Sequence, residues 1–188
     1  TEKFNHVTSF FNSTRKDPFP GEDRLLVPSP KVATYDLKPE MSLPEVESKL
    51  LEAMEKDYEL IVCNFANPDM VGHTGIWEAV ITAIERIDLA LKKVCEKSKT
   101  TGQVVMITAD HGNADQMLDT SGAVRTAHST NMVPFIIYNS QKDIKLVEPC
   151  SNPDDVYAST TLADIAPTIL EYLDLEKPSE MLASSLII

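Results

Sequence analysis

The chain has 188 residues, of which 43% are hydrophobic and 24% are charged, as in an ordinary globular protein with one sizeable core. Its net charge of −12 argues against nucleic acid as a partner, because phosphate backbones are bound by clustered lysines and arginines. No apolar run approaches the roughly 20 residues that span a bilayer, and the first residues lack a signal-peptide pattern. We therefore expect a cytoplasmic protein without membrane contact.

The three cysteines do not form a recognisable framework. Cys63, Cys95 and Cys150 are widely spaced, odd in number and free of any C-x-x-C pattern. A disulfide scaffold and a cysteine zinc site are both disfavoured, and a reducing compartment is the expected setting.

The first 42 residues lack a regular hydrophobic pattern. Residues 7–11 are compatible with a short strand, whereas the proline-rich stretch 16–38 predicts an extended loop. A loop of that length inside a compact domain is usually functional or serves as a connector.

Regular elements are predicted from residue 42 onward. A helix is expected over residues 42–57, with Ser42 as its N-cap and Pro44 in its first turn. The short apolar run 60–65 then predicts a buried strand.

The rest of the chain alternates between helices and strands. A long amphipathic helix is predicted over 76–97, buried strands over 104–108 and 133–138, and a last helix over 161–173 that Pro167 interrupts or restarts. The apolar stripe of the long helix, which we expect to be core, consists of Ile76, Val80, Ile81, Ile84, Ile87, Leu91 and Val94. This alternation predicts an α/β domain with a largely parallel sheet flanked by helices.

Three of the four histidines lie in short segments with metal-ligand chemistry: 67–75 (NPDMVGHTG), 108–115 (TADHGNAD) and 126–131 (TAHSTN). Carboxylate and neutral imidazole are ligands of zinc, manganese and related divalent ions. The first two segments follow predicted strands, and α/β sheets bind ligands beyond the carboxyl ends of their strands. A metal centre, with one ion or two, is therefore a candidate function, and bound cations would offset the acidity of the chain.

Simpler interpretations of these residues remain open at this point. Asp69 and His73 share a face only if the segment is helical, and such a pair is often a surface pair or a helix cap. Asp110 and His111 before a glycine also suit a plain turn. His6 lies outside the constellation, and Asp115 is either an outer partner of the metal ligands or a helix cap.

The same segments resemble the metal-binding motifs of cofactor-independent phosphoglycerate mutases, a family of the alkaline phosphatase superfamily. Residues 2–8 (EKFNHVT) and 28–41 (PSPKVATYDLKPEM) are also similar to stretches of that family, so the resemblance covers the whole chain. It implies an alkaline-phosphatase-like fold and, in the parent protein, the interconversion of 3- and 2-phosphoglycerate in glycolysis and gluconeogenesis. It also implies two divalent metal ions, usually manganese.

The resemblance assigns roles by position. Asp69, His73 and His128 match the ligands of one metal, and Asp110 and His111 match ligands of the other. Lys3 matches a lysine that contacts the substrate phosphate. The metals would activate a serine alkoxide, which takes up the phosphoryl group and returns it to the other hydroxyl of the glycerate.

Family members are more than twice as long as this chain, and their nucleophilic serine and substrate-gripping arginines lie upstream of the matched region. Ser9, Ser13, Ser29 and Ser42 are not in the nucleophile context of the family. The resemblance thus implies that residues 1–188 are the C-terminal portion of the metal-binding domain, with 1–42 leading in from a transferase domain. We expect the chain alone to be inactive and to hold at most one ion well.

Two other functions are compatible with these residues. One is another enzyme of the superfamily, such as a phosphopentomutase or a phosphohydrolase, and the other is a non-catalytic metal-binding fragment. The parent protein is expected to be monomeric, whereas the isolated piece is expected to associate through exposed sheet edges.

Overall fold

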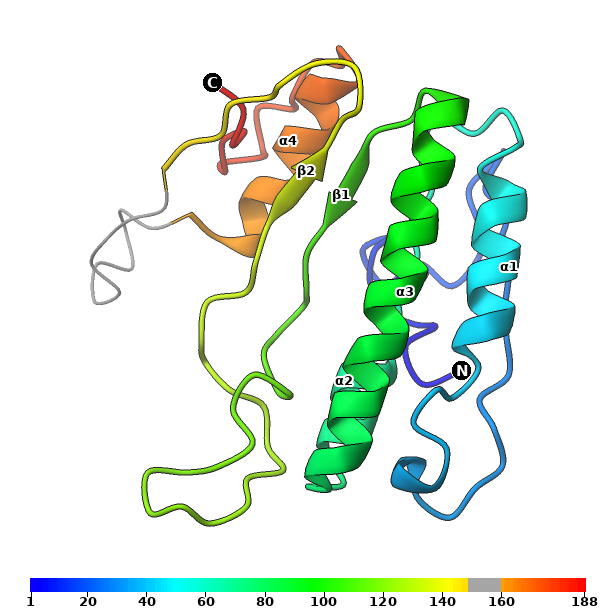
Figure 1. Cartoon of the computed structure of the whole chain (residues 1–188). Helices are drawn as coiled ribbons and strands as arrows, with labels where there is room; N and C mark the ends of the chain where they lie inside the picture. The colour runs from blue at the N-terminus through cyan, green and yellow to red at the C-terminus, as the bar shows by residue number, and fades with distance from the viewer. Residues whose placement is uncertain (149–159) are drawn as a thin grey trace. The chain divides into compact units, whose positions relative to one another are not determined.

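The structure is a computed structural model that describes residues 1–148 and 160–188 (Figure 1). The chain forms two compact units, Thr1–Tyr138 and Asn139–Ile188. Every residue that the sequence analysis assigns to a metal or to the substrate lies in the first unit. None of the helices in the described ranges is both long and apolar enough to cross a membrane.

The helices of the first unit are η1 (Tyr35–Leu37, a 3₁₀ helix), α1 (Leu43–Ala53), α2 (Asn67–Gly72) and α3 (Trp77–Thr101). Helices α1 and α3 lie side by side (Figure 1) and are linked by an ion pair of Glu47 with Lys93, and Glu55 just beyond α1 pairs with Lys97. Helix α2 and η1 both contact α3. A small apolar core joins these elements and contains Met41, Val71, Ala79, Val80, Ala83 and Met117.

Helix α1 begins one residue after Ser42, as predicted, but Ser42 does not cap it through its side chain. Its hydroxyl instead donates to the carbonyl of Pro28 at 2.6 Å, which ties the loop before the helix to the helix start. Pro44 lies in the first turn, where a missing amide hydrogen is tolerated. The helix ends at Ala53, four positions earlier than predicted.

The long helix α3 buries a narrower face than its apolar pattern predicts. The buried residues of this face include Val80, Val94 and the small residues Ala83 and Ala90. The small side chains of the two alanines allow the neighbouring helices to approach closely. Ile76, Ile81 and Ile84 are exposed, so the expectation that the whole stripe is core is wrong for these three residues. Gly102 ends the helix in a left-handed conformation at φ 74°, which glycine adopts without strain.

The described residues contain two strands, β1 (Val105–Ile107) and β2 (Ile136–Tyr138). Both were predicted, but they pair antiparallel, with Met106 opposite Ile137, and not in the parallel order that the sequence suggested. The connection between them contains no helix, and a parallel pair needs a long crossover that is usually helical.

Two predicted strands are wrong. The run 60–65 has no ladder to another strand in the described part of the chain, and Leu60 and Val62 are exposed. Residues 7–11 form successive turns, in which the amide of Phe10 donates to the carbonyl of Asn5. Hydrophobic composition favours a strand, but a strand also needs a partner for its backbone.

The second unit contains η2 (Leu162–Asp164) and α4 (Ile165–Tyr172). Thr161 and Asp164 form a capping box at the start of η2. Pro167 lies in the first turn of α4, where a missing amide hydrogen is tolerated, so the helix continues through it. Leu146 pairs with Ile187 in an isolated bridge. Cys63 and Cys95 are free thiols, while Cys150 lies outside the described residues.

Candidate metal centre

Helix α2 presents Asp69 and His73 on one face, as their spacing of four predicts. The amide of His73 donates to the carbonyl of Asp69 at 3.0 Å, which continues the helical turn beyond Gly72. Oδ1 of Asp69 lies 3.1 Å from Nε2 of His73. The helical alternative for this segment is therefore the one that the structure adopts.

His128 reaches the same place from the loop between β1 and β2. Its Nε2 atom lies 3.1 Å from Oδ1 of Asp69 and 3.2 Å from Nε2 of His73. Asp69, His73 and His128 thus offer one ligand atom each, all within 4.8 Å of one another. Carboxylate and imidazole donors at this separation fit a divalent ion placed between them.

A hydrogen bond to the backbone sets the tautomer of His73. Its Nδ1 atom lies 2.7 Å from the carbonyl oxygen of Thr126. Because a carbonyl can only accept, Nδ1 carries the proton and the neutral ring leaves the Nε2 lone pair free. Ligating histidines are typically oriented by this kind of partner.

Asn113 orients the carboxylate of Asp69. Its side-chain amide donates to Oδ1 of Asp69 at 2.7 Å and to the backbone carbonyl of Asp69 at 3.2 Å. Gly72 makes room for it, because a Cβ atom at that position would lie 2.5 Å from Oδ1 of Asn113. Sequence reasoning assigned Asn113 no role, although its place between Asp110 and Asp115 was a usable signal.

Lys3 crosses to this cluster from the N-terminal turns and is 8% exposed. Its Nζ atom lies 2.7 Å from Oδ2 of Asp69, 3.2 Å from Nε2 of His111 and 3.6 Å from Oδ2 of Asp110. The two sets of predicted ligands therefore meet at one ammonium group. Among the described residues, only Asp69, His73 and His128 form a group of three with metal-ligand spacing, so Asp110 and His111 are a pair beside Lys3.

Opposing effects act on the Asp69 carboxyl. Burial alone would raise its pKa, but hydrogen bonds from Lys3 and Asn113 outweigh burial and lower the pKa from 3.8 to about 2. Asp69 is consequently ionised at neutral pH, which is the form that binds a metal.

The imidazole rings of His111 and His128 are stacked. Their centroids are 3.7 Å apart and their planes differ by 18°. This contact joins a member of the first ligand set to a member of the second. His6 lies outside the cluster, as expected, and packs edge-on against Phe10.

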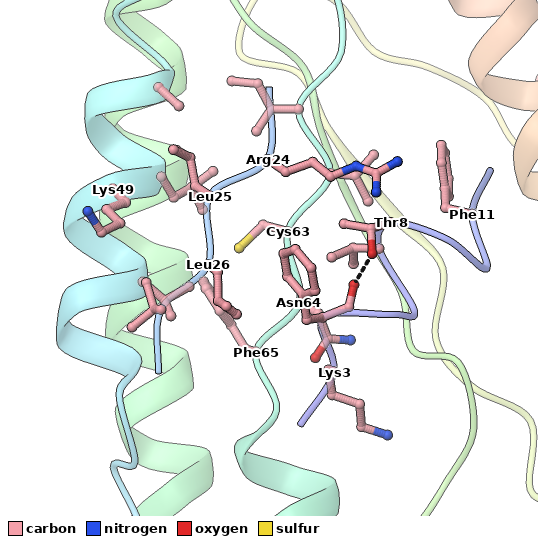
Figure 2. Close-up of a pocket in the computed structure, with 18 of the residues that line it drawn as sticks. Lys3, Thr8, Phe11, Arg24, Leu25, Leu26, Lys49, Cys63, Asn64 and Phe65 are labelled. Atoms are coloured by element: carbon pink, nitrogen blue, oxygen red, sulfur yellow. Dashed lines mark hydrogen bonds between the residues drawn. The ribbon is translucent and has the colours of Figure 1, made fainter. Parts of the chain in front are cut away.

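A separate, mostly apolar pocket of about 430 Å³ lies between the N-terminal segment, α1 and the run 60–65. Figure 2 shows that the amino group of Lys3 points away from the pocket side chains Leu25 and Leu26. Lys3 thus lines the pocket with its aliphatic stem while its charge faces the metal-type cluster.

Comparisons with known proteins agree with this arrangement. Residues 1–177 match the Metalloenzyme superfamily. The whole chain is 50% identical to 2,3-bisphosphoglycerate-independent phosphoglycerate mutases of Pseudomonas fluorescens and Bacteroides fragilis, and it spans 35% of the length of each.

A solved structure is similar as well. A crystal structure of Leishmania mexicana phosphoglycerate mutase at low cobalt concentration matches with a TM-score of 0.86 and 32% identity, covering 100% of this chain and 36% of that one. The alkaline-phosphatase-like α/β fold is thereby confirmed. The chain belongs to the Metalloenzyme superfamily and is similar over its whole length to the C-terminal part of 2,3-bisphosphoglycerate-independent phosphoglycerate mutases.

Proposed function

We propose that this chain provides the metal-binding, phosphatase-type part of a phosphoglycerate mutase that interconverts 3- and 2-phosphoglycerate. The convergence of Asp69, His73 and His128 beside the amino group of Lys3 is the observation that carries the proposal. In this proposal, residues 1–188 are the C-terminal portion of the metal-binding domain, and residues 1–42 lead in from a transferase domain. The reaction belongs to glycolysis and gluconeogenesis, so we propose a cytoplasmic parent protein. We also propose that the parent protein is monomeric.

The proposed centre uses Asp69, His73 and His128 for one divalent ion and Asp110 and His111 for a second. Manganese is our choice of metal because the resemblance to the mutase family implies it, and the carboxylate ligands suit it. Divalent cations supply charge that stabilises a transferring phosphoryl group and activates a hydroxyl nucleophile. The first set has three protein ligands and the second has two, so we propose that this chain alone holds at most one ion tightly.

Lys3 is proposed to bind the phosphate of the substrate. Its ammonium is buried and already lies among the candidate ligands, 2.7 Å from Asp69 and 3.2 Å from His111. A lysine acts on phosphate as a compact point charge, so it can exchange a carboxylate partner for a phosphoryl oxygen. This assignment places phosphate binding directly beside both ligand sets.

An enolase-coupled assay tests the proposed reaction. The complete natural polypeptide that contains these residues is loaded with Mn²⁺ and given 3-phosphoglycerate without added 2,3-bisphosphoglycerate. We expect turnover that chelation abolishes. Asp69→Asn should lower it by more than about 100-fold, because losing a metal ligand should cost more than losing an outer partner of a ligand, which typically costs 10–100-fold. Asp119→Asn is the matched control, because the bonds of Asp119 stay within its own turn.

The competing functions give different results in the same preparation. Release of inorganic phosphate from phosphate esters would indicate a phosphohydrolase, and isomerisation of a pentose phosphate would indicate a phosphopentomutase. Tight metal binding without turnover of any of these substrates would indicate a non-catalytic role. The 188-residue chain of verified mass, assayed in parallel, is expected to show no turnover.

A further inference from the structure

Asp115 joins two loops of the β1–β2 connection, residues 108–115 with His111 and residues 126–131 with His128. One of its carboxylate oxygens accepts hydrogen bonds from the Ser129 hydroxyl at 2.9 Å and the Asn131 amide at 2.6 Å. The other oxygen lies 3.1 Å from the same hydroxyl. A single carboxylate on the first loop therefore holds two side chains of the second.

The backbone reinforces this contact. The amide of Ser129 donates to the carbonyl of Gly112 at 2.9 Å, and the two residues form an isolated antiparallel bridge. A Cβ atom at Gly112 would lie 2.1 Å from the Ser129 hydroxyl and 2.6 Å from a carboxylate oxygen of Asp115. A larger residue at position 112 would thus have to displace the Ser129 hydroxyl or the Asp115 carboxylate, and Ser129 is 6% exposed there.

The contact of Gly112 and Asp115 with Ser129, called the clamp below, lies next to the two histidines in the chain. Gly112 comes directly after His111, and Ser129 comes directly after His128. The two imidazoles stack with centroids 3.7 Å apart. A displacement of either loop at the clamp must therefore move a ring of the stacked pair.

We propose that Asp115 is a positioning residue that couples the two ligand sets by holding His111 and His128 in register through Ser129. The proposal rests on the metal-binding function proposed above. It predicts that loss of Asp115 weakens the binding of both ions together, because His111 belongs to one ligand set and His128 to the other. Loss of a direct ligand such as His73 would act mainly on one ion.

The test is a titration of Co²⁺ into the metal-free complete polypeptide, followed by calorimetry and by the visible absorption of the bound ion. Asp115→Ala is expected to weaken both binding steps by roughly 10- to 100-fold, the range known for outer partners of metal ligands, and to alter the absorption bands. Asp115→Asn keeps one acceptor for Ser129 but turns an amide toward Asn131, so it should give an intermediate loss. This milder variant also serves if Asp115→Ala does not fold.

Asp119→Asn is the matched control, since it removes a carboxylate from the same connection whose hydrogen bonds to Ser121 and Ala123 stay within its own turn. It should bind Co²⁺ as the unaltered protein does, with the same spectrum. The proposal is overturned if the Asp115 variants bind both ions normally, if only one step weakens, or if Asp119→Asn weakens binding equally. Failure of the unaltered protein to bind Co²⁺ would instead remove the proposed function, and this inference with it.

Discussion

The amino group of Lys3 lies 2.7 Å from a carboxylate oxygen of Asp69, joining the N-terminal turns to helix α2. The other oxygen of that carboxylate faces His73 and His128. The ammonium of Lys3 also lies 3.2 Å from His111 and 3.6 Å from Asp110, so it stands between Asp69 and the second ligand pair. In the proposed centre, Asp69 is the residue that binds both the metal ion, through one oxygen, and the ammonium of Lys3, through the other.

Replacing Lys3 by methionine should destabilise the metal-free protein. Asp69 would keep its charge in a mostly buried site and lose a partner, which costs about 1–3 kcal/mol in the free energy of unfolding. Added Mn²⁺ should reduce that loss, because a cation again neutralises the carboxylate. Urea unfolding in chelator and in Mn²⁺ measures both quantities. Lys93→Met, which removes an exposed ion pair, should change stability by less than about 1 kcal/mol in either buffer.

His73→Ala should weaken Mn²⁺ binding at one site by more than about 100-fold, beyond the 10–100-fold typical of outer partners. The reason is that Nε2 of His73 is one of three candidate ligand atoms within 4.8 Å. Calorimetric titration gives the affinity and the stoichiometry. His6→Ala is the matched control, since that exposed ring packs edge-on against Phe10 and lies outside the cluster. Equal affinity in the two variants would contradict the assignment.

The lowered pKa of Asp69 predicts a specific acid response in the metal-free protein. Its folded-state pKa is about 2, below the value of about 3.9 in an unfolded chain. Its stabilising contribution is therefore complete above about pH 4 and is lost as the pH falls through about 2. The free energy of unfolding of the unaltered chain minus that of Asp69→Asn should shrink as the pH falls from about 4 to about 2. A difference that grows over that range would show that folding raises the pKa of this carboxyl instead of lowering it.

Gly72→Ala sets helix propensity against packing. Propensity alone predicts a gain of about 1 kcal/mol, because alanine favours a helix over glycine. We expect a loss of about 1–3 kcal/mol, since the added Cβ would lie 2.5 Å from the buried Oδ1 of Asn113. Combining it with Asn113→Ala should remove the clash and recover part of the loss. Denaturant unfolding of the three variants decides the sign, and a stabilised single variant would refute the packing argument.

The isolated 188-residue chain is predicted to self-associate through the run 60–65. Leu60 and Val62 are exposed there, and the segment has no strand partner within the described ranges. Light scattering should show a mass that rises with concentration, and Val62→Glu should suppress the rise. Leu37→Glu removes a leucine elsewhere that is even more exposed than Leu60, so it should leave the association unchanged.

Local chemistry explains which features were predictable from sequence. The spacing of Asp69 and His73 places both on one helical face wherever the segment is helical, and Pro68 and the following glycines define a short helix there. The start of α3 and the strand at Val105 follow from periodicity, and Gly102 ends the helix four residues beyond the predicted end at residue 97. These features depend on neighbours in the chain.

Features that depend on distant partners were not predictable. Whether the run 60–65 forms a strand depends on a backbone partner, which composition does not reveal. The position of Lys3 against His111 joins segments 108 residues apart, and the clamp between Asp115 and Ser129 joins residues 14 apart in an irregular connection. The resemblance to a family supplied roles for Lys3 and the histidines, but it offered none for Asn113 or Ser129.

The most direct test of the central claim is anomalous diffraction at the manganese edge from crystals of the complete polypeptide grown with Mn²⁺. The account predicts a peak within roughly 2.0–2.2 Å of an Asp69 oxygen and of Nε2 in both His73 and His128, the range seen for such ligands in zinc sites. A second peak should lie beside Asp110 and His111. Manganese bound elsewhere, with Asp69, His73 and His128 still paired only with one another and with Lys3, would contradict it.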